Sequence, residues 1–107
     1  MNPPHGRVLW FTGLSGAGKT ILSRAVAREL IQEGIRAQIL DAFEIRQGLS
    51  SDLGYSNGER MESVRRIAHV SKFFSRSGET VLVAGISPRL TTTCQRKRDG
   101  VYIIRIK

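Results

Sequence analysis

The chain has 107 residues, of which 40% are hydrophobic and 24% charged, and its formal net charge is +8. These values are typical of one small, soluble globular domain. No apolar run approaches the roughly 20 residues that a membrane-spanning helix needs, and the first residues lack the pattern of a signal peptide. A single cysteine, Cys94, cannot form an internal disulfide, so we expect a reducing, cytoplasmic setting and no membrane partner.

The spacing of apolar residues predicts strands that alternate with helices. In chain order we expect a strand at 7–12, a helix at 19–34, a strand at 36–41 and a short helix at 42–49. A loop follows at 50–58, then a long helix at 59–78, a strand at 80–86 and a last strand at 101–107. Gly34 and Gly78 end the two longer helices. This alternation predicts an α/β fold with a mostly parallel sheet and right-handed crossovers.

Helical spacing also predicts which side chains are buried. In the first helix, the apolar face would consist of Ile21 or Leu22, Ala25 or Val26, and Leu30; in the long helix, of Met61, Val64, Ile67, Ala68, Ser71 and Phe74. We expect Trp10 in the core and His69 on the surface of its helix.

Residues 13–20, GLSGAGKT, match the phosphate-binding pattern G-x-x-x-x-G-K-[ST], with the required strand before and helix after. Glycines let the backbone N–H groups curl around a phosphate, and the next helix adds its positive N-terminal end. Lys19 supplies a cation for the outer phosphates, and Thr20 a hydroxyl for Mg²⁺. The predicted phosphate-binding residues are Gly13, Leu14, Ser15, Gly16, Ala17, Gly18, Lys19 and Thr20.

Three features are predicted to meet at one edge of the sheet. The glycine loop follows the first strand, Asp41 ends the second, and Ser87 ends the third. Ligands of open parallel sheets bind outside the carboxyl ends of the strands. We therefore expect the functional site at this edge.

Several segments, in this order, resemble the adenylyl-sulfate kinase family: LWFTGLSGAGKT, LD, IRQGLSSDLGYS, ER.E..RRIAHVSK and VLVAGISP. The resemblance runs from about Arg7 to Pro88. It implies a P-loop NTPase-type fold of three layers, α/β/α. It also implies that ATP, with Mg²⁺, phosphorylates adenosine 5′-phosphosulfate at the 3′-hydroxyl. The product, 3′-phosphoadenosine 5′-phosphosulfate, belongs to sulfate assimilation.

The resemblance further implies individual roles. Catalytic roles fall to Lys19, Asp41 and Ser87, and Ser87 matches the serine described in the family as a phosphoserine intermediate. The positions that match substrate contacts are Arg46, Tyr55, Arg60, Ser63 and Ile86. Arginine and aromatic side chains suit a dianionic adenosine ligand through charge-assisted hydrogen bonds and ring contact.

Two positions depart from the family pattern. Phe43 stands where the family has the second acid of a D-G-D segment, and a phenyl ring can neither organise Mg²⁺ nor accept a proton. Ser63 stands where the family usually has asparagine. The first departure leaves open a non-catalytic nucleotide-binding relative as an alternative.

The likeness fades after Pro88. We therefore divide the chain into a kinase-like part, 1–88, and a divergent basic tail, 89–107, and expect the sheet to be incomplete on its C-terminal side. The tail carries six basic residues and one acidic residue. A small basic nucleic-acid-binding protein is a further alternative, although no zinc-ligand spacing or aromatic–basic interleaving supports it. A homodimer is one way to complete the kinase.

Overall fold

The computed structural model describes residues 6–13, 18–85 and 101–105. Its elements in chain order are β1 (Val8–Thr12), α1 (Lys19–Gln32), β2 (Ala37–Asp41), α2 (Ala42–Gln47), α3 (Asn57–Arg76), β3 (Thr80–Ala84) and β4 (Val101–Arg105). The type of every predicted element is confirmed. The predicted loop at 50–58 is too long, because α3 already begins at Asn57.

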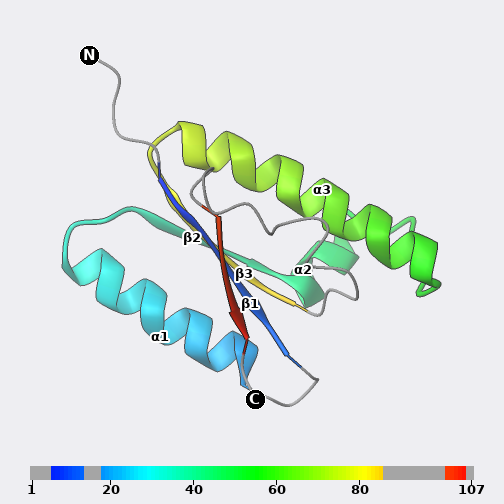
Figure 1. Cartoon of the computed structure of the whole chain (residues 1–107), viewed down its shortest axis with the longest axis horizontal. Coiled ribbons are helices and arrows are strands. Elements are labelled where there is room, and N and C mark those ends of the chain that lie inside the picture. Colours follow the sequence, from blue (N-terminus) through cyan, green and yellow to red (C-terminus); the bar gives the residue numbers. More distant parts are fainter. Residues whose placement is uncertain (1–5, 14–17, 86–100, 106–107) are drawn as a thin grey trace.

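The four strands form one sheet in the order β2-β3-β1-β4, and every pair is parallel. Helix α1 lies on one face of this sheet, and α2 and α3 lie on the other, which confirms the three-layer α/β/α fold (Figure 1). The expected last strand is confirmed as β4, which pairs with β1 from Val8 opposite Val101 to Thr12 opposite Arg105.

Alternation along the strands divides the core into two clusters, because successive side chains point to opposite faces of a sheet. Towards α2 and α3 lie Val8, Trp10, Val81 and Val83 with Ile45, Val64 and Ile67, joined by the partly buried Leu40, Ala68 and Phe74. Towards α1 lie Phe11, Leu82 and Ala27, joined by Leu9, Val26, Leu30, Ala37 and Ile39. The core position expected for Trp10 is confirmed.

The predicted apolar face of α1 is partly wrong. The helix buries Ser23 and Ala27, with Val26 and Leu30 packed beside them, whereas Ile21 and Leu22 are both exposed, at 77% and 39%. The buried face of α1 consists of small side chains, Ser23 and Ala27, which let the helix lie close to the sheet. The expected surface position of His69 on α3 is confirmed.

None of the helices in the described part of the chain is both long enough and apolar enough to cross a membrane.

Leu82 lies at 0% exposure in the central strand β3 and packs against Phe11 and Ala27. We expect Leu82→Ala to lower the free energy of unfolding by about 2–5 kcal/mol, because the truncation loses apolar burial and leaves a cavity. Urea unfolding measures this change. The matched variant Ile31→Ala, at a position that is 58% exposed, should stay within about 0.5 kcal/mol of the wild type. Equal losses in both variants would contradict the assignment of the core.

Candidate functional site

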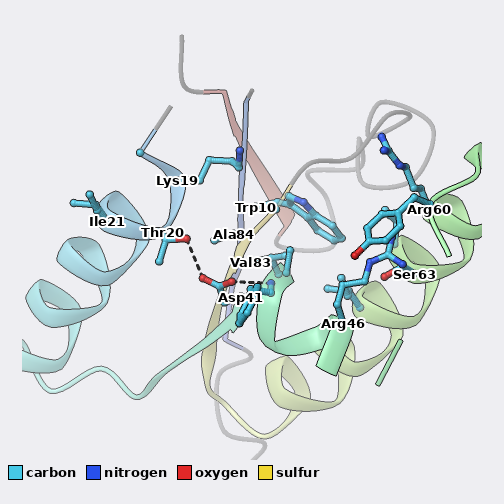
Figure 2. Close-up of a pocket in the computed structure, with 17 residues that line it drawn as sticks. Trp10, Lys19, Thr20, Ile21, Asp41, Arg46, Arg60, Ser63, Val83 and Ala84 are labelled. Atoms are coloured by element: carbon cyan, nitrogen blue, oxygen red, sulfur yellow. Dashed lines mark hydrogen bonds between the residues drawn. The ribbon is translucent and has the colours of Figure 1, made fainter. Parts of the chain in front are cut away.

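A cavity of about 680 Å³ opens at the carboxyl edge of the sheet. Eight of the predicted site residues line it: Gly18, Lys19, Thr20, Asp41, Arg46, Tyr55, Arg60 and Ser63. Figure 2 shows Lys19 and Thr20 on the α1 side, Arg60 and Ser63 on the α3 side, and Trp10 between them. The strand register explains this meeting, because Asp41 and Phe11 both lie opposite Ala84 at the last pairs of their strands.

The remaining predicted residues are placed differently. Gly13 is described, and its carbonyl oxygen accepts a hydrogen bond from the Nζ of Lys19 at 2.9 Å. Six further predicted residues lie outside the described part of the chain: Leu14, Ser15, Gly16, Ala17, Ile86 and Ser87. The predicted end of the third strand at Ser87 is not reached by β3, which ends at Ala84.

The N-terminus of α1 forms the phosphate end of the cavity. Gly18 precedes the helix with a φ of 90°, a conformation that favours glycine. No described side chain caps this helix. The N–H groups of its first turn lie at the positive end of the helix dipole, an arrangement that favours binding of an anion.

Asp41 connects this end to α2. Its Oδ2 accepts a hydrogen bond from the Thr20 hydroxyl at 2.9 Å, and its Oδ1 accepts one from the Phe43 N–H at 2.8 Å (Figure 2). Asp41 is thus both the last residue of β2 and the N-cap of α2. With both oxygens engaged, the carboxylate has one fixed orientation beside the Thr20 hydroxyl.

The pair of Thr20 and Asp41 fits a magnesium ion. Hydroxyl and carboxylate oxygens are ligands that Mg²⁺ prefers, and this ion is usually held by one or two carboxylates together with substrate phosphates. Within the described ranges, no cluster of three or more His, Cys, Asp or Glu side chains could hold a metal by itself.

Arg46 and Tyr55 form the opposite end of the cavity. The guanidinium carbon of Arg46 lies 4.4 Å from the centre of the Tyr55 ring, within cation–π range. The Nη1 of Arg46 also donates hydrogen bonds to the carbonyl oxygens of Leu53 at 3.2 Å and Gly54 at 2.5 Å. Tyr55 remains 69% exposed, so its ring is available to a ligand.

A capping box begins α3. The Ser56 hydroxyl accepts a hydrogen bond from the Glu59 N–H at 3.2 Å and donates one to Glu59 Oε1 at 2.8 Å. The other oxygen, Oε2, accepts the Gly54 N–H at 2.6 Å. The Gly54 N–H, followed by the Ser56 hydroxyl, lowers the pKa of Glu59 below its ordinary value. The pattern S-x-x-E at 56–59 is the sequence signal that would have placed the start of this helix correctly.

An ion network ties the loop before α3 to the helix. Arg66 donates to both carboxylate oxygens of Asp52, at 2.7 and 3.1 Å, and to the Leu49 carbonyl at 2.9 Å. Glu62 accepts hydrogen bonds from Arg65 and Arg66. Arg65 first, and then Arg66, lower the pKa of Glu62 to about 2, and Arg66 lowers the pKa of Asp52. In turn, Asp52 and Glu62 raise the pKa of Arg66.

Ser63 reaches the cavity from the second turn of α3. Its hydroxyl lies 2.9 Å from the hydroxyl of Ser50, and both side chains are buried. Arg60 is three residues earlier on the same helix, so it presents its charge on the same face. The cavity therefore carries Lys19 at one end and Arg46 with Arg60 at the other.

Further lining residues were not predicted as part of the site: Trp10, Ile21, Ala42, Phe43, Val64, Ile67, Val83, Ala84 and Gly85. Trp10 is 1% exposed, and its buried Nε1 has no hydrogen-bond partner among the described residues. Phe43 is 72% exposed, so the position that departs from the family pattern opens directly on the cavity. An apolar pattern alone does not separate such residues from ordinary core or surface positions.

Comparison with known proteins places this geometry among kinases. A family model described as adenylylsulphate kinase matches residues 5–101. A relative from Bacillus subtilis named "Probable adenylyl-sulfate kinase" is 52% identical over 88 residues, which are 82% of this chain and 44% of the relative. The chain thus spans less than half the length of that relative.

Two solved structures are similar in fold. The Mycobacterium tuberculosis APS kinase CysC, in complex with AMPPNP and APS, matches with a TM-score of 0.90 and 37% identity, over 98% of this chain and 64% of that one. A hexameric APS kinase from Thiobacillus denitrificans matches with a TM-score of 0.81 and 34% identity, over 95% of this chain and 22% of that one. The P-loop kinase fold expected from the sequence is thereby confirmed.

The acidic side of the ion network predicts how stability depends on pH. Because the pKa of Glu62 falls from 4.5 to about 2 on folding, the unfolded state binds more protons between these values. The stabilisation is therefore complete above about pH 4.5 and is lost as the pH falls towards 2. We expect the melting temperature to drop over this interval and to drop less steeply in Glu62→Gln. Parallel curves for the two proteins would contradict the role of Glu62.

Proposed function

The chain belongs to the adenylylsulphate kinase family, and we propose that it transfers the γ-phosphoryl group of ATP to the 3′-hydroxyl of adenosine 5′-phosphosulfate. The observation that carries this proposal is one cavity with a phosphate-binding helix terminus at one end and an arginine–tyrosine pair at the other. Phosphoryl transfer depends mainly on positioning and charge neutralisation, and such a cavity provides both.

In this proposal ATP binds at the α1 end. The N–H groups of the first turn and the Lys19 ammonium hold the phosphates, while Thr20 and Asp41 hold Mg²⁺. When bound, Mg²⁺ neutralises charge on the β- and γ-phosphates. Among the described residues that line the cavity, Asp41 is the only carboxylate, and it contacts Thr20 directly.

Adenosine 5′-phosphosulfate binds at the α3 end. Tyr55 offers an aromatic face to the adenine base, and the Arg46 guanidinium behind it fixes that face. Arg60 and Ser63 supply a positive charge and a hydroxyl to the anionic groups. The M. tuberculosis kinase whose complex contains AMPPNP and APS supports this division into two ligand ends.

Partner and location are proposed on separate grounds. The hexameric T. denitrificans kinase supports assembly of this chain into oligomers, and a homodimer is the simplest form. The cytoplasmic location, inferred from the single cysteine, stays a prediction. The nucleic-acid alternative has no support among the described residues, and most of the basic tail, residues 89–100 and 106–107, lies outside them.

A second candidate function is nucleotide binding without phosphoryl transfer. Phe43 favours it, because this exposed phenyl ring lines the cavity two residues from Asp41, where the family pattern has an acid. The experiment that separates the two candidates follows ADP and 3′-phosphoadenosine 5′-phosphosulfate side by side in one reaction. Formation of ADP and 3′-phosphoadenosine 5′-phosphosulfate in equal amounts supports the kinase. A chain that binds ADP but forms no 3′-phosphoadenosine 5′-phosphosulfate supports the second candidate and contradicts the first.

Lys19 donates a hydrogen bond to the Gly13 carbonyl oxygen and lines the cavity. We expect Lys19→Ala to weaken binding of Mg-ADP roughly 10- to 100-fold, since a hydrogen bond to a charged group contributes about 1.5–3 kcal/mol. Titration calorimetry measures the affinity. Lys72→Ala, a matched removal of an exposed lysine on α3, should leave it unchanged. Equal affinities of wild type and Lys19→Ala would remove this residue from the nucleotide site.

We expect Phe43→Asp to raise turnover at least tenfold, because a positioned acid–base group contributes roughly 10²–10⁴-fold to such reactions. The rate of 3′-phosphoadenosine 5′-phosphosulfate formation is the measurement. Phe73→Asp is the matched control, since Phe73 is 56% exposed on α3 and does not line the cavity. Turnover that Phe43→Asp leaves unchanged would show that no acid is needed at this position.

A further inference from the structure

Gly54, the residue before Tyr55, is held at both of its backbone polar groups by side chains of opposite charge. Its N–H donates to Glu59 Oε2 at 2.6 Å, and its carbonyl oxygen accepts from Arg46 Nη1 at 2.5 Å. Charge-assisted hydrogen bonds of this kind are short and stronger than neutral ones. The peptide groups on either side of Gly54 are thereby fixed between α2 and α3.

The packing at this point is tight on the side of Glu59. A Cβ atom at position 54 would lie 2.8 and 3.1 Å from the two carboxylate oxygens of Glu59. The carboxylate therefore lies directly against the backbone of Gly54. The hydrogen bond of 2.6 Å from the Gly54 N–H to Glu59 Oε2 holds the two residues together at this point.

The contact reaches farther than capping of α3 requires. A capping box joins the N-cap residue and the third residue of the helix, which here are Ser56 and Glu59. Glu59 extends beyond Ser56 to a residue two positions earlier. On the other side of Gly54, Arg46 both holds the backbone and lies 4.4 Å from the Tyr55 ring.

We propose that Glu59 is a positioning residue for the substrate site: by holding Gly54 against Arg46, it orients the Tyr55 ring as the platform for the adenine base of the acceptor nucleotide. This inference rests on the proposed function. Glu59 does not line the cavity, so it acts through Gly54 and Tyr55 and not by direct contact with the ligand. A pre-oriented ring binds a base without the entropic cost of ordering the loop first.

The experiment compares Glu59→Gln with Glu62→Gln, which removes the same charge from the same helix without touching Gly54. Trp10 is the only tryptophan and lines the cavity, so its fluorescence reports binding of adenosine 5′-phosphosulfate and, separately, of Mg-ADP. The amide is uncharged and keeps only one of the two acceptor oxygens, so neither hydrogen bond stays charge-assisted and the two donors no longer each have their own acceptor oxygen. We expect Glu59→Gln to lower the affinity for adenosine 5′-phosphosulfate about five- to tenfold and the affinity for Mg-ADP less than about twofold. Glu62→Gln should change neither affinity.

A double-mutant cycle separates positioning from simple stabilisation of α3. In a Tyr55→Leu background the platform is gone, so Glu59→Gln should cause no additional loss of affinity for adenosine 5′-phosphosulfate. A capping role alone would lower the melting temperature and leave this affinity unchanged while the protein stays folded. That result, or additive losses in the cycle, would overturn the proposal.

A readout without ligand keeps this inference distinct from the proposed function. NMR contacts between the Tyr55 ring protons and the Arg46 side chain should be present in the wild type and in Glu62→Gln, and reduced in Glu59→Gln. If the wild type binds no adenosine 5′-phosphosulfate, the proposed substrate is wrong, and the ring contacts still decide whether Glu59 orients Tyr55. Contacts that persist unchanged in Glu59→Gln overturn the positioning role.

Discussion

Burial of β3 between β2 and β1, in parallel register with both, is the constraint on which the site depends. All five of its residues are buried, and its alternate side chains supply both halves of the core. Because the pairing is parallel, the strands end at the same edge. Ala84 lies opposite both Asp41 and Phe11, so the start of α2 and the end of β1 lie at the same edge of the sheet, on either side of β3. The cavity follows from this register.

Much of this arrangement could be predicted from the sequence. Short apolar runs gave the strands, and the pattern at 13–20 identified the phosphate loop in its required context. Asp41 could be placed at the site because strand ends converge in any parallel sheet of this kind. Residues far apart in the chain, such as Arg46 and Arg60, were assigned by family resemblance only. Both residues line the cavity because tertiary packing brings α2 and α3 together there, and no local sequence pattern encodes that packing.

The errors have physical causes. Large apolar residues at helical spacing favoured Ile21 or Leu22 for the core, yet α1 approaches the sheet through Ser23 and Ala27. Ile21 instead lies in the first turn of α1, where it lines the cavity. The start of α3 was placed two residues late because the capping serine stands among loop-forming residues. Short polar side chains serve both turns and helix caps, so composition alone does not separate the two.

Helix α2 connects the two ends of the cavity and sets the distance between them. It has six residues, with Asp41 capping its first turn and Arg46 in its last. At 1.5 Å per residue, these two positions are separated by roughly 8 Å along the helix axis. One inserted residue would turn Arg46 by about 100° and take the guanidinium away from Gly54 and Tyr55. The phosphate end and the aromatic end are therefore not independent sites. Their relative position depends on a short rigid element, and α2 in turn depends on the register of β2 against β3.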